Sequence, residues 1–190
     1  MIPWTFKKFE VLNMSKQNSR IKKITIVALM VAIDVVLSPI FRIEGMAPMS
    51  SVVNVIAAPL LGPVYATIMA VMCGIIRMLL LGIPPLALTG AVFGALLAGI
   101  FYKWGHKVWC ATLGEIIGTG IIGSLLSYPV MAWFTGSSSS LYLFIYTPRF
   151  FGAAVIGSVV AYIILLKLIQ IKPFKEAQKL FWPEGFLRSE

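Results

Sequence analysis

Three ionisable side chains lie within long apolar stretches of the sequence: Asp34, Arg77 and Glu115. A charged side chain inside a lipid bilayer is costly, so it usually pairs with another charge, faces a water-filled cavity or marks a substrate or proton path. At a helical rise of about 1.5 Å per residue, Asp34 is expected near the middle of a membrane, Arg77 in its outer third and Glu115 nearer the inner side. These three residues are therefore the first candidates for a functional role.

Asp34 and Arg77 are expected at depths that the long arginine side chain can bridge. One interpretation is a structural ion pair between two helices, and the other is that Arg77 faces a cavity and donates hydrogen bonds to a ligand. Glu115 lies within the glycine-rich segment 114–120, whose spacing favours close helix packing. Its carboxyl group could bind a proton or a cation, or extend to the inner interface.

A second set of polar and aromatic residues is expected at the outer level of the membrane. A single aromatic residue there usually belongs to the interfacial belt. Aromatic walls with a few directional polar groups are, however, what a pocket for a small planar molecule needs. The predicted pocket residues are Asn54, Arg77, Thr89, Tyr128, Trp133, Tyr146 and Arg149.

Several other kinds of site are excluded. The single histidine, His106, lies in a basic loop, so no serine–histidine dyad forms within the apolar segments. Cys73 and Cys110 differ in expected depth, which argues against a disulfide or a shared metal site. No Walker-type phosphate-binding loop is present. We expect no enzyme activity, no metal site and no cofactor of the chain's own.

The elements that position these side chains are predicted to be membrane-spanning helices. Of the 190 residues, 59% are hydrophobic and 12% are charged, and the mean hydropathy is +0.92, whereas soluble domains carry about 25% charged residues. This composition excludes disorder, and two cysteines are too few for a disulfide-stapled module. We expect an all-α integral membrane protein. The net charge of +9 lies mainly in tails and loops and forms no nucleic-acid-binding patch.

Six apolar stretches are predicted to span the membrane. The second is too short for a hydrocarbon core of about 30 Å, and it ends at Gly62 and Pro63. An alternative with five spans treats it as a re-entrant segment. The expected spans are 24–41, 51–61, 64–81, 86–102, 109–134 and 150–171.

The positions of the lysines and arginines predict the orientation. With six spans, all of the 16 basic residues except Arg42, Arg77 and Arg149 fall on one side, so both termini are expected in the cytoplasm. A basic segment, 1–23, precedes the membrane domain, 24–171. The tail, 172–190, either lies flat in the inner interface as an amphipathic segment or is frayed. No small-residue cleavage site follows the first span, so this span is expected to be retained.

The first span carries a pair of alanines, Ala28 and Ala32, which form a flat stripe for close helix packing. Together with the length, six spans and cytoplasmic termini, this stripe resembles the substrate-binding S components of energy-coupling factor (ECF) vitamin transporters. In that family the stripe docks a transmembrane T component, which two cytosolic ATPases drive. The resemblance thus implies a bundle of S-component type in the bacterial plasma membrane, with ATP used only by the partner subunits.

Four segments resemble the ThiW-type S components more closely: 53–63, 74–77, 93–99 and 113–120. That family is assigned to uptake of hydroxyethylthiazole, the thiazole precursor of thiamine, and the resemblance alone suggests this substrate. The segment 45–51 departs from the more aromatic and polar stretch of the family, so the exact ligand stays open.

The resemblance implies a pocket that binds its substrate from outside, beneath a loop at about 39–50. Stacking on the thiazole would come from the aromatic residues of the predicted pocket, and hydrogen bonds would come from Asn54 and Arg77. Two alternatives remain. The chain could be an S component for another vitamin or precursor, or a stand-alone transporter in which Asp34 or Glu115 carries a coupling proton.

Overall fold

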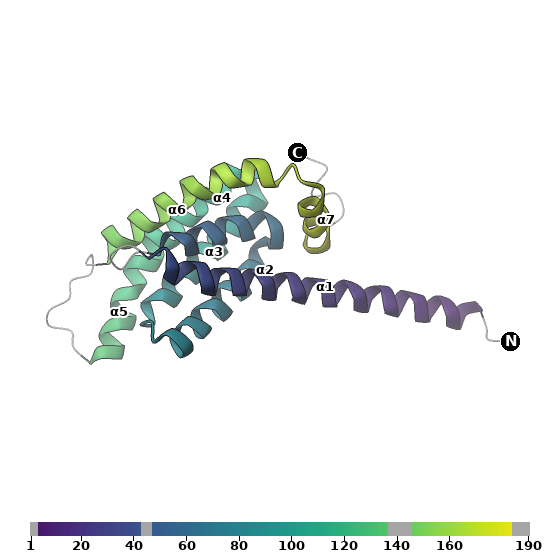
Figure 1. Ribbon diagram of the computed structural model, residues 1–190, viewed down its shortest axis with the longest axis horizontal. Coiled ribbons are helices and arrows are strands. Elements are labelled where there is room, and N and C mark those ends of the chain that lie inside the picture. The colour runs from purple at the N-terminus through teal and green to yellow at the C-terminus, as the bar shows by residue number, and fades with distance from the viewer. Residues whose placement is uncertain (1–3, 43–46, 137–145, 184–190) are drawn as a thin grey trace.

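The computed structural model of the chain is helical throughout the residues that it describes, which are 4–42, 47–136 and 146–183, with side chains from residue 17 onward (Figure 1). Helices α4, η1 and α5 follow one another without a break, and η1 is a π-helical segment. The elements are α1 (Trp4–Ile40), α2 (Pro48–Leu81), α3 (Leu86–Gly105), α4 (Val108–Glu115), η1 (Ile116–Gly123), α5 (Ser124–Thr135), α6 (Thr147–Leu168) and α7 (Lys172–Phe181).

Five helical stretches of the described chain are long and apolar enough to cross a membrane: Gln17–Ile40, Pro48–Leu81, Leu86–Gly105, Val108–Thr135 and Thr147–Leu168. The first and the last three agree with predicted spans, most ends lying within about one turn of helix. The exception is the start of α1, which extends well before the predicted first span. The predicted second and third spans both fall within α2.

Helix α2 doubles back on itself at Gly62, where φ is 74° and ψ is 173°. A straight helix would separate residues 27 positions apart by about 40 Å. Instead, Arg77 Nη1 lies 3.3 Å from Ser50 Oγ, 27 positions earlier. The two halves of α2 are therefore antiparallel, and the chain reverses at the predicted Gly62–Pro63 break. The positive φ favours glycine at this turn.

Helix α3 packs closely against the continuous α4–η1 segment. Glycines on the two sides face each other, so a Cβ atom at Gly118 would collide with the Phe93 carbonyl and the Gly94 Cα atom, and one at Gly123 would meet the Gly90 Cα atom. This contact of backbone on backbone fixes Glu115, at the end of α4, against α3.

Helix α7 folds back onto the bundle. The Trp182 indole N–H donates to the Pro59 carbonyl at 2.7 Å, and Gln178 Nε2 lies 3.2 Å from the Tyr102 hydroxyl. Pro63 has no N–H, so the Pro59 carbonyl lacks its usual helical partner, and Trp182 supplies one. Of the two alternatives for the tail, fraying is wrong for Lys172–Phe181, and the apolar face covers protein.

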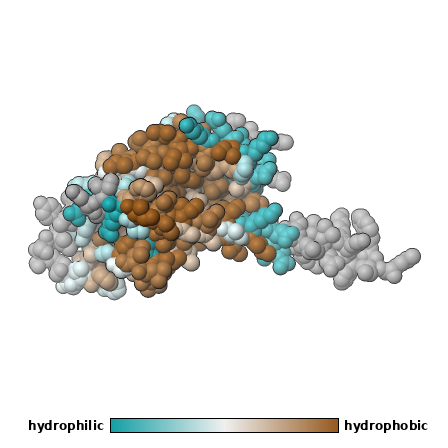
Figure 2. All heavy atoms as spheres, in the orientation of Figure 1, coloured by the Kyte–Doolittle hydropathy of each residue, from teal (hydrophilic) through white to brown (hydrophobic). Residues whose placement is uncertain are grey.

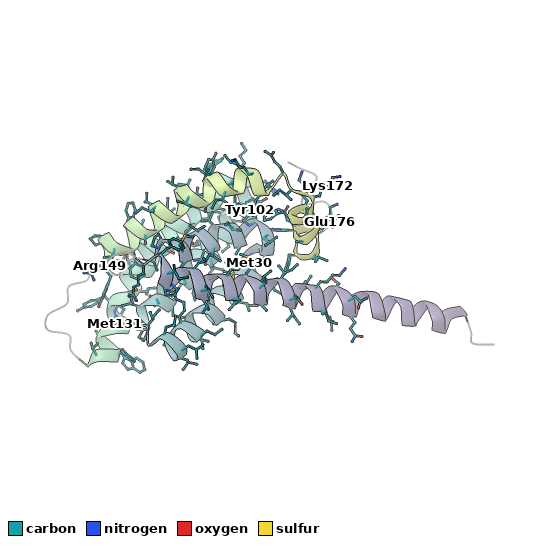
Figure 3. The ribbon with its side chains drawn as sticks, viewed as in Figure 1. Met30, Tyr102, Met131, Arg149, Lys172 and Glu176 are labelled. Atoms are coloured by element: carbon teal, nitrogen blue, oxygen red, sulfur yellow. The ribbon has the colours of Figure 1, made fainter. Side chains whose placement is uncertain are left out.

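The surface has the pattern of a protein that sits in lipid. Figure 2 shows apolar residues covering the middle of the bundle, with hydrophilic residues gathered at its two ends. Large apolar side chains such as Leu79 and Leu80 are more than three-quarters exposed. Figure 3 shows Arg149 at the start of α6 and Lys172 at the start of α7, on opposite ends of the molecule. The beginning of α1 projects on the side of α7 (Figure 1).

Candidate ligand-binding site

A cavity of about 70 Å³ opens between both halves of α2, the start of α3, the α4–η1 junction and the start of α6. One water molecule needs about 10–15 Å³, so the cavity has room for a small molecule. It lies at the end of the molecule that carries Arg149, away from α7. The lining residues are Arg42, Ala47, Ser50, Ser51, Asn54, Arg77, Ile83, Leu86, Ala87, Gly90, Ala91, Glu115, Thr119, Arg149, Phe150 and Ala153.

Asn54 lines this cavity. The first half of α2 holds the side chain, which is only 1% exposed. Its Nδ2 atom donates to the Ala91 carbonyl at 3.2 Å and to Glu115 Oε1 at 3.4 Å. The carbonyl accepts hydrogen bonds only, so the nitrogen must face Ala91. The oxygen, Oδ1, has no hydrogen-bond partner.

Glu115 is fully buried at the wall next to Asn54. Its Oε1 atom contacts the hydroxyl of Thr119 at 2.7 Å, one turn further along the same helix, as well as the Asn54 amide. The Thr119 hydroxyl also lies 3.0 Å from the Gly90 carbonyl. The Ser51 side chain also interacts with the carboxyl group, and the second carboxyl oxygen, Oε2, has no hydrogen-bond partner within 3.5 Å.

Arg77 enters the cavity from the second half of α2 and is 4% exposed. Its Nη1 atom donates to Ser50 Oγ, which lies 3.4 Å from Asp34 Oδ2. The Ser38 hydroxyl donates to Asp34 Oδ1 at 2.5 Å, and the Cys73 thiol also interacts with the Asp34 carboxyl group. The predicted pairing of Asp34 with Arg77 is therefore bridged by Ser50 in the structure. Arg77 Nε has no partner.

The unpartnered buried side-chain atoms of the described chain all belong to the cavity. They are Asn54 Oδ1, Arg77 Nε and Glu115 Oε2. A buried polar atom without a hydrogen bond costs about 1–3 kcal/mol, and the three atoms belong to cavity-lining residues on the two halves of α2 and at the end of α4. Residues that line one cavity thus carry two unpaired acceptors and one unpaired donor, which a small polar ligand can complete.

The structure brings together part of the predicted pocket. Asn54, Arg77 and Arg149 line the cavity, and so does Glu115, which the sequence singled out only as an intramembrane charge. Thr89 does not line it, because its hydroxyl is 2.6 Å from Ser127 Oγ and 2.8 Å from the Leu86 carbonyl.

The three aromatic residues that were predicted to form a wall of the pocket do not line the cavity. Tyr128, Trp133 and Tyr146 are absent from the cavity lining, and Trp133 is 86% exposed near the end of α5. Expected depth placed these rings at the outer level, but depth alone does not say which way a side chain points. The aromatic ring that lines the cavity is Phe150.

Sequence reasoning missed Ser50, Thr119 and Phe150. Thr119 carries a usable signal, because it lies four residues after Glu115 and therefore near the same face of the helix. Phe150 directly follows Arg149 in the sequence. Ser50 lies in the segment that departs from the expected family pattern, where no functional residue was predicted. The predicted loop 39–50 lies partly outside the described residues, which omit 43–46.

Ala28 and Ala32 lie on the outward face of α1. Both are exposed, whereas Met30, Val31 and Asp34 on the same helix are buried against the bundle. The alanine stripe is thus free of contacts that would block another helix.

Comparison with known families adds the deciding observation. A family model described as thiamine-precursor transporter protein (ThiW) matches residues 24–171. The chain belongs to the ThiW family. No curated protein and no solved structure gives a significant match. The matched region of this ThiW protein contains every residue that lines the cavity and leaves out α7. The family and the apolar helices together indicate a multi-pass membrane protein that transports a thiamine precursor.

Proposed function

We propose that this ThiW protein is the substrate-binding S component of an ECF-type importer in a bacterial plasma membrane, and that it binds hydroxyethylthiazole. The observation that carries the proposal is the cavity with three unpartnered polar atoms, Asn54 Oδ1, Arg77 Nε and Glu115 Oε2. A binding subunit needs a few directional polar groups beside apolar surface. This cavity offers these groups beside Ile83, Leu86 and Phe150, and Arg42, Ser51 and Arg149 line it as well.

Hydroxyethylthiazole matches the chemistry of the wall. Its ring nitrogen is an acceptor for Arg77 Nε, and its hydroxyl group can donate to an acceptor on the opposite wall. Ile83, Leu86 and Phe150 supply apolar surface for the ring.

The proposed topology has six passes with both termini in the cytoplasm. Because α2 doubles back at Gly62, its halves count as two passes. The basic residues gathered near the start of α1 and on α7 mark the cytoplasmic side. The cavity, at the opposite end, then opens to the outside.

Energy for transport would come from partner subunits. In this proposal a T component docks on Ala28 and Ala32, and two cytosolic ATPases drive it. The support is the exposure of both alanines on α1 and the lack of a Walker-type motif in the sequence.

Isothermal titration calorimetry on the detergent-purified chain tests the binding role. Hydroxyethylthiazole is expected to bind saturably with one site per chain, while riboflavin produces no heat. Tryptophan fluorescence is a poor substitute, since Trp133 lies away from the cavity. Binding of thiamine or of its aminopyrimidine precursor alone would keep the S-component role and change the substrate. No binding of any of these ligands would contradict the proposal.

One observation favours the proton-coupled alternative, namely the buried carboxyl group of Glu115 facing the cavity. Uptake into proteoliposomes that contain only this chain, driven by a pH gradient, would support it. We expect uptake only when the T component and the ATPases are present.

A further inference from the structure

The three unpartnered polar atoms of the cavity-lining residues are of two types, two acceptors and one donor, and the side chains of Arg42, Ser51 and Arg149 line the same cavity. The wall formed by Asn54 and Glu115 offers acceptors, and the guanidinium of Arg77 offers a donor. Both hydrogens of the Asn54 amide are used, one on the Ala91 carbonyl and one on Glu115 Oε1, so only its oxygen is left for a ligand. Glu115 Oε1 is likewise occupied by Asn54 and Thr119, which leaves Oε2.

Ser50 holds the donor next to the half of α2 that carries Asn54. Ser50, which holds the Arg77 guanidinium, and Asn54 lie four residues apart on the first half of α2. Residues at this spacing on a helix have Cβ atoms about 5–6 Å apart. A small ligand that joins the two sides needs an acceptor for Arg77 and a donor for Asn54 or Glu115.

We propose that Asn54 and Glu115 are specificity residues that require a hydrogen-bond donor on the ligand. This inference rests on the proposed function and deepens it. The substrate class is a heteroaromatic ring with an acceptor nitrogen for Arg77 and an alcohol or amine substituent for the Asn54–Glu115 wall. A ligand with an ether or alkyl group in that place leaves unpaired the buried acceptor that an alcohol would satisfy, and a site of this kind rejects such analogues.

A matched series of ligands tests the requirement on the full chain. Calorimetry would compare hydroxyethylthiazole with its O-methyl ether and with 5-ethyl-4-methylthiazole, which differ only at the substituent. We expect both analogues to bind at least about 5-fold more weakly than the alcohol, since an unpaired buried acceptor costs about 1–3 kcal/mol. Equal affinity for the alcohol and the ether would overturn the proposal.

The variant Glu115→Gln makes a sharper prediction. The amide oxygen of the new side chain must take the place of Oε1, because Asn54 Nδ2 donates there. Its NH2 group then replaces Oε2 and turns an acceptor into a donor. An ether oxygen can accept from that donor, so the preference for alcohol over ether should fall several-fold. Glu176→Gln is the matched control, because Glu176 is exposed on α7 at the far end of the molecule.

The other possible outcomes show whether the donor requirement fails or the proposed substrate is wrong. An unchanged preference in Glu115→Gln would contradict the role of Glu115. If that variant does not fold, the ligand series on the unmodified chain still decides. If only the aminopyrimidine precursor binds, the proposed thiazole is wrong, and the donor requirement is tested by comparing that ligand with its dimethylamino analogue. Binding of neither ring would overturn both proposals.

Discussion

At the scale of single residues, Arg77 does two things with one guanidinium group. Its Nη1 atom contacts Ser50, which in turn contacts the buried Asp34, while its Nε atom has no hydrogen-bond partner and the residue lines the cavity. The two interpretations offered by the sequence, a structural charge and a ligand donor, are therefore compatible within one side chain. The planar guanidinium permits this, because its donors point in several fixed directions.

The variant Arg77→Lys separates the two roles. Lysine keeps the positive charge near Asp34 but cannot hold Ser50 and present a second fixed donor to the cavity. We expect the affinity for hydroxyethylthiazole to fall about 10-fold or more, in line with the loss of a hydrogen bond to a charged group. Thermal unfolding in detergent should change little. Arg20→Lys, at an exposed position on α1, is the control. Unaltered affinity would show that Nε does not contact the ligand.

Residue types could be predicted from the sequence at this scale, but orientations could not. Asn54 and Arg77 stood out because polar side chains in apolar helices are costly and rare, and the structure places both on the cavity. Trp133 stood out by depth alone and turns outward. Whether an atom such as Glu115 Oε2 is unpartnered depends on side chains from three elements, and no local pattern reports that.

At the scale of elements, the contact between α3 and η1 sets the position of Glu115. Gly118 has no room for a methyl group, because backbone atoms of Phe93 and Gly94 lie against it. We expect Gly118→Ala to push the two helices apart and to reduce ligand affinity at least several-fold by displacing Glu115. Calorimetry with hydroxyethylthiazole measures this effect.

A matched substitution controls for the general effect of replacing glycine in an apolar helix. At Gly74 the nearest atom to a new methyl group is Cδ1 of Leu88, the flexible end of a side chain. Gly74→Ala should therefore keep much more of the affinity than Gly118→Ala. Similar losses in both variants would argue against a special role for the α3–η1 contact.

The packing of α7 on the bundle is expected to contribute to the stability of the fold and not to ligand binding. Trp182→Phe keeps an aromatic ring next to Gly62 but removes the hydrogen bond to the Pro59 carbonyl, which Pro63 cannot replace. We expect a loss of about 1–3 kcal/mol in unfolding free energy, seen as a lower midpoint in thermal unfolding. Ligand affinity should persist, because the cavity lies at the other end. Trp109→Phe, at a half-exposed position, should leave the midpoint nearly unchanged.

Most of the membrane-spanning helices could be predicted from the sequence, since long apolar runs bounded by glycine, proline or charged residues are typical of such helices. The reversal at Gly62 was expected from Gly62 and Pro63. The π-helical segment Ile116–Gly123 was not expected, because nothing in its hydrophobic pattern distinguishes it from an α-helix. The fold of α7 onto the bundle was also undetermined, since an amphipathic helix can cover lipid or protein equally well.

At the scale of the whole molecule, the exposed stripe of Ala28 and Ala32 is the part of the proposed mechanism that can be tested without touching the cavity. We expect Ala28→Trp to abolish uptake of labelled hydroxyethylthiazole in cells that contain the T component and the ATPases. Binding to the purified variant should stay within about 2-fold of the original, because Ala28 faces away from the bundle. A bulky ring there prevents close approach of a second helix.

Ile163→Trp is the control for this prediction, since Ile163 is 59% exposed on α6 and lies outside the stripe. Uptake by this variant should be normal. If Ala28→Trp lowers binding as strongly as uptake, the stripe supports the fold rather than a partner. If both variants transport normally, the docking site lies elsewhere.

The hairpin formed by α2 has a consequence for how the chain enters the membrane during synthesis. Its first half, Pro48–Leu61, is about 21 Å long and too short to cross a hydrocarbon core of about 30 Å by itself. We expect the two halves to insert together. Arg77 would then cross the lipid already joined to Ser50, which lowers the cost of carrying a charge into the bilayer. The newly made chain would thus deliver two walls of the cavity in a single insertion event.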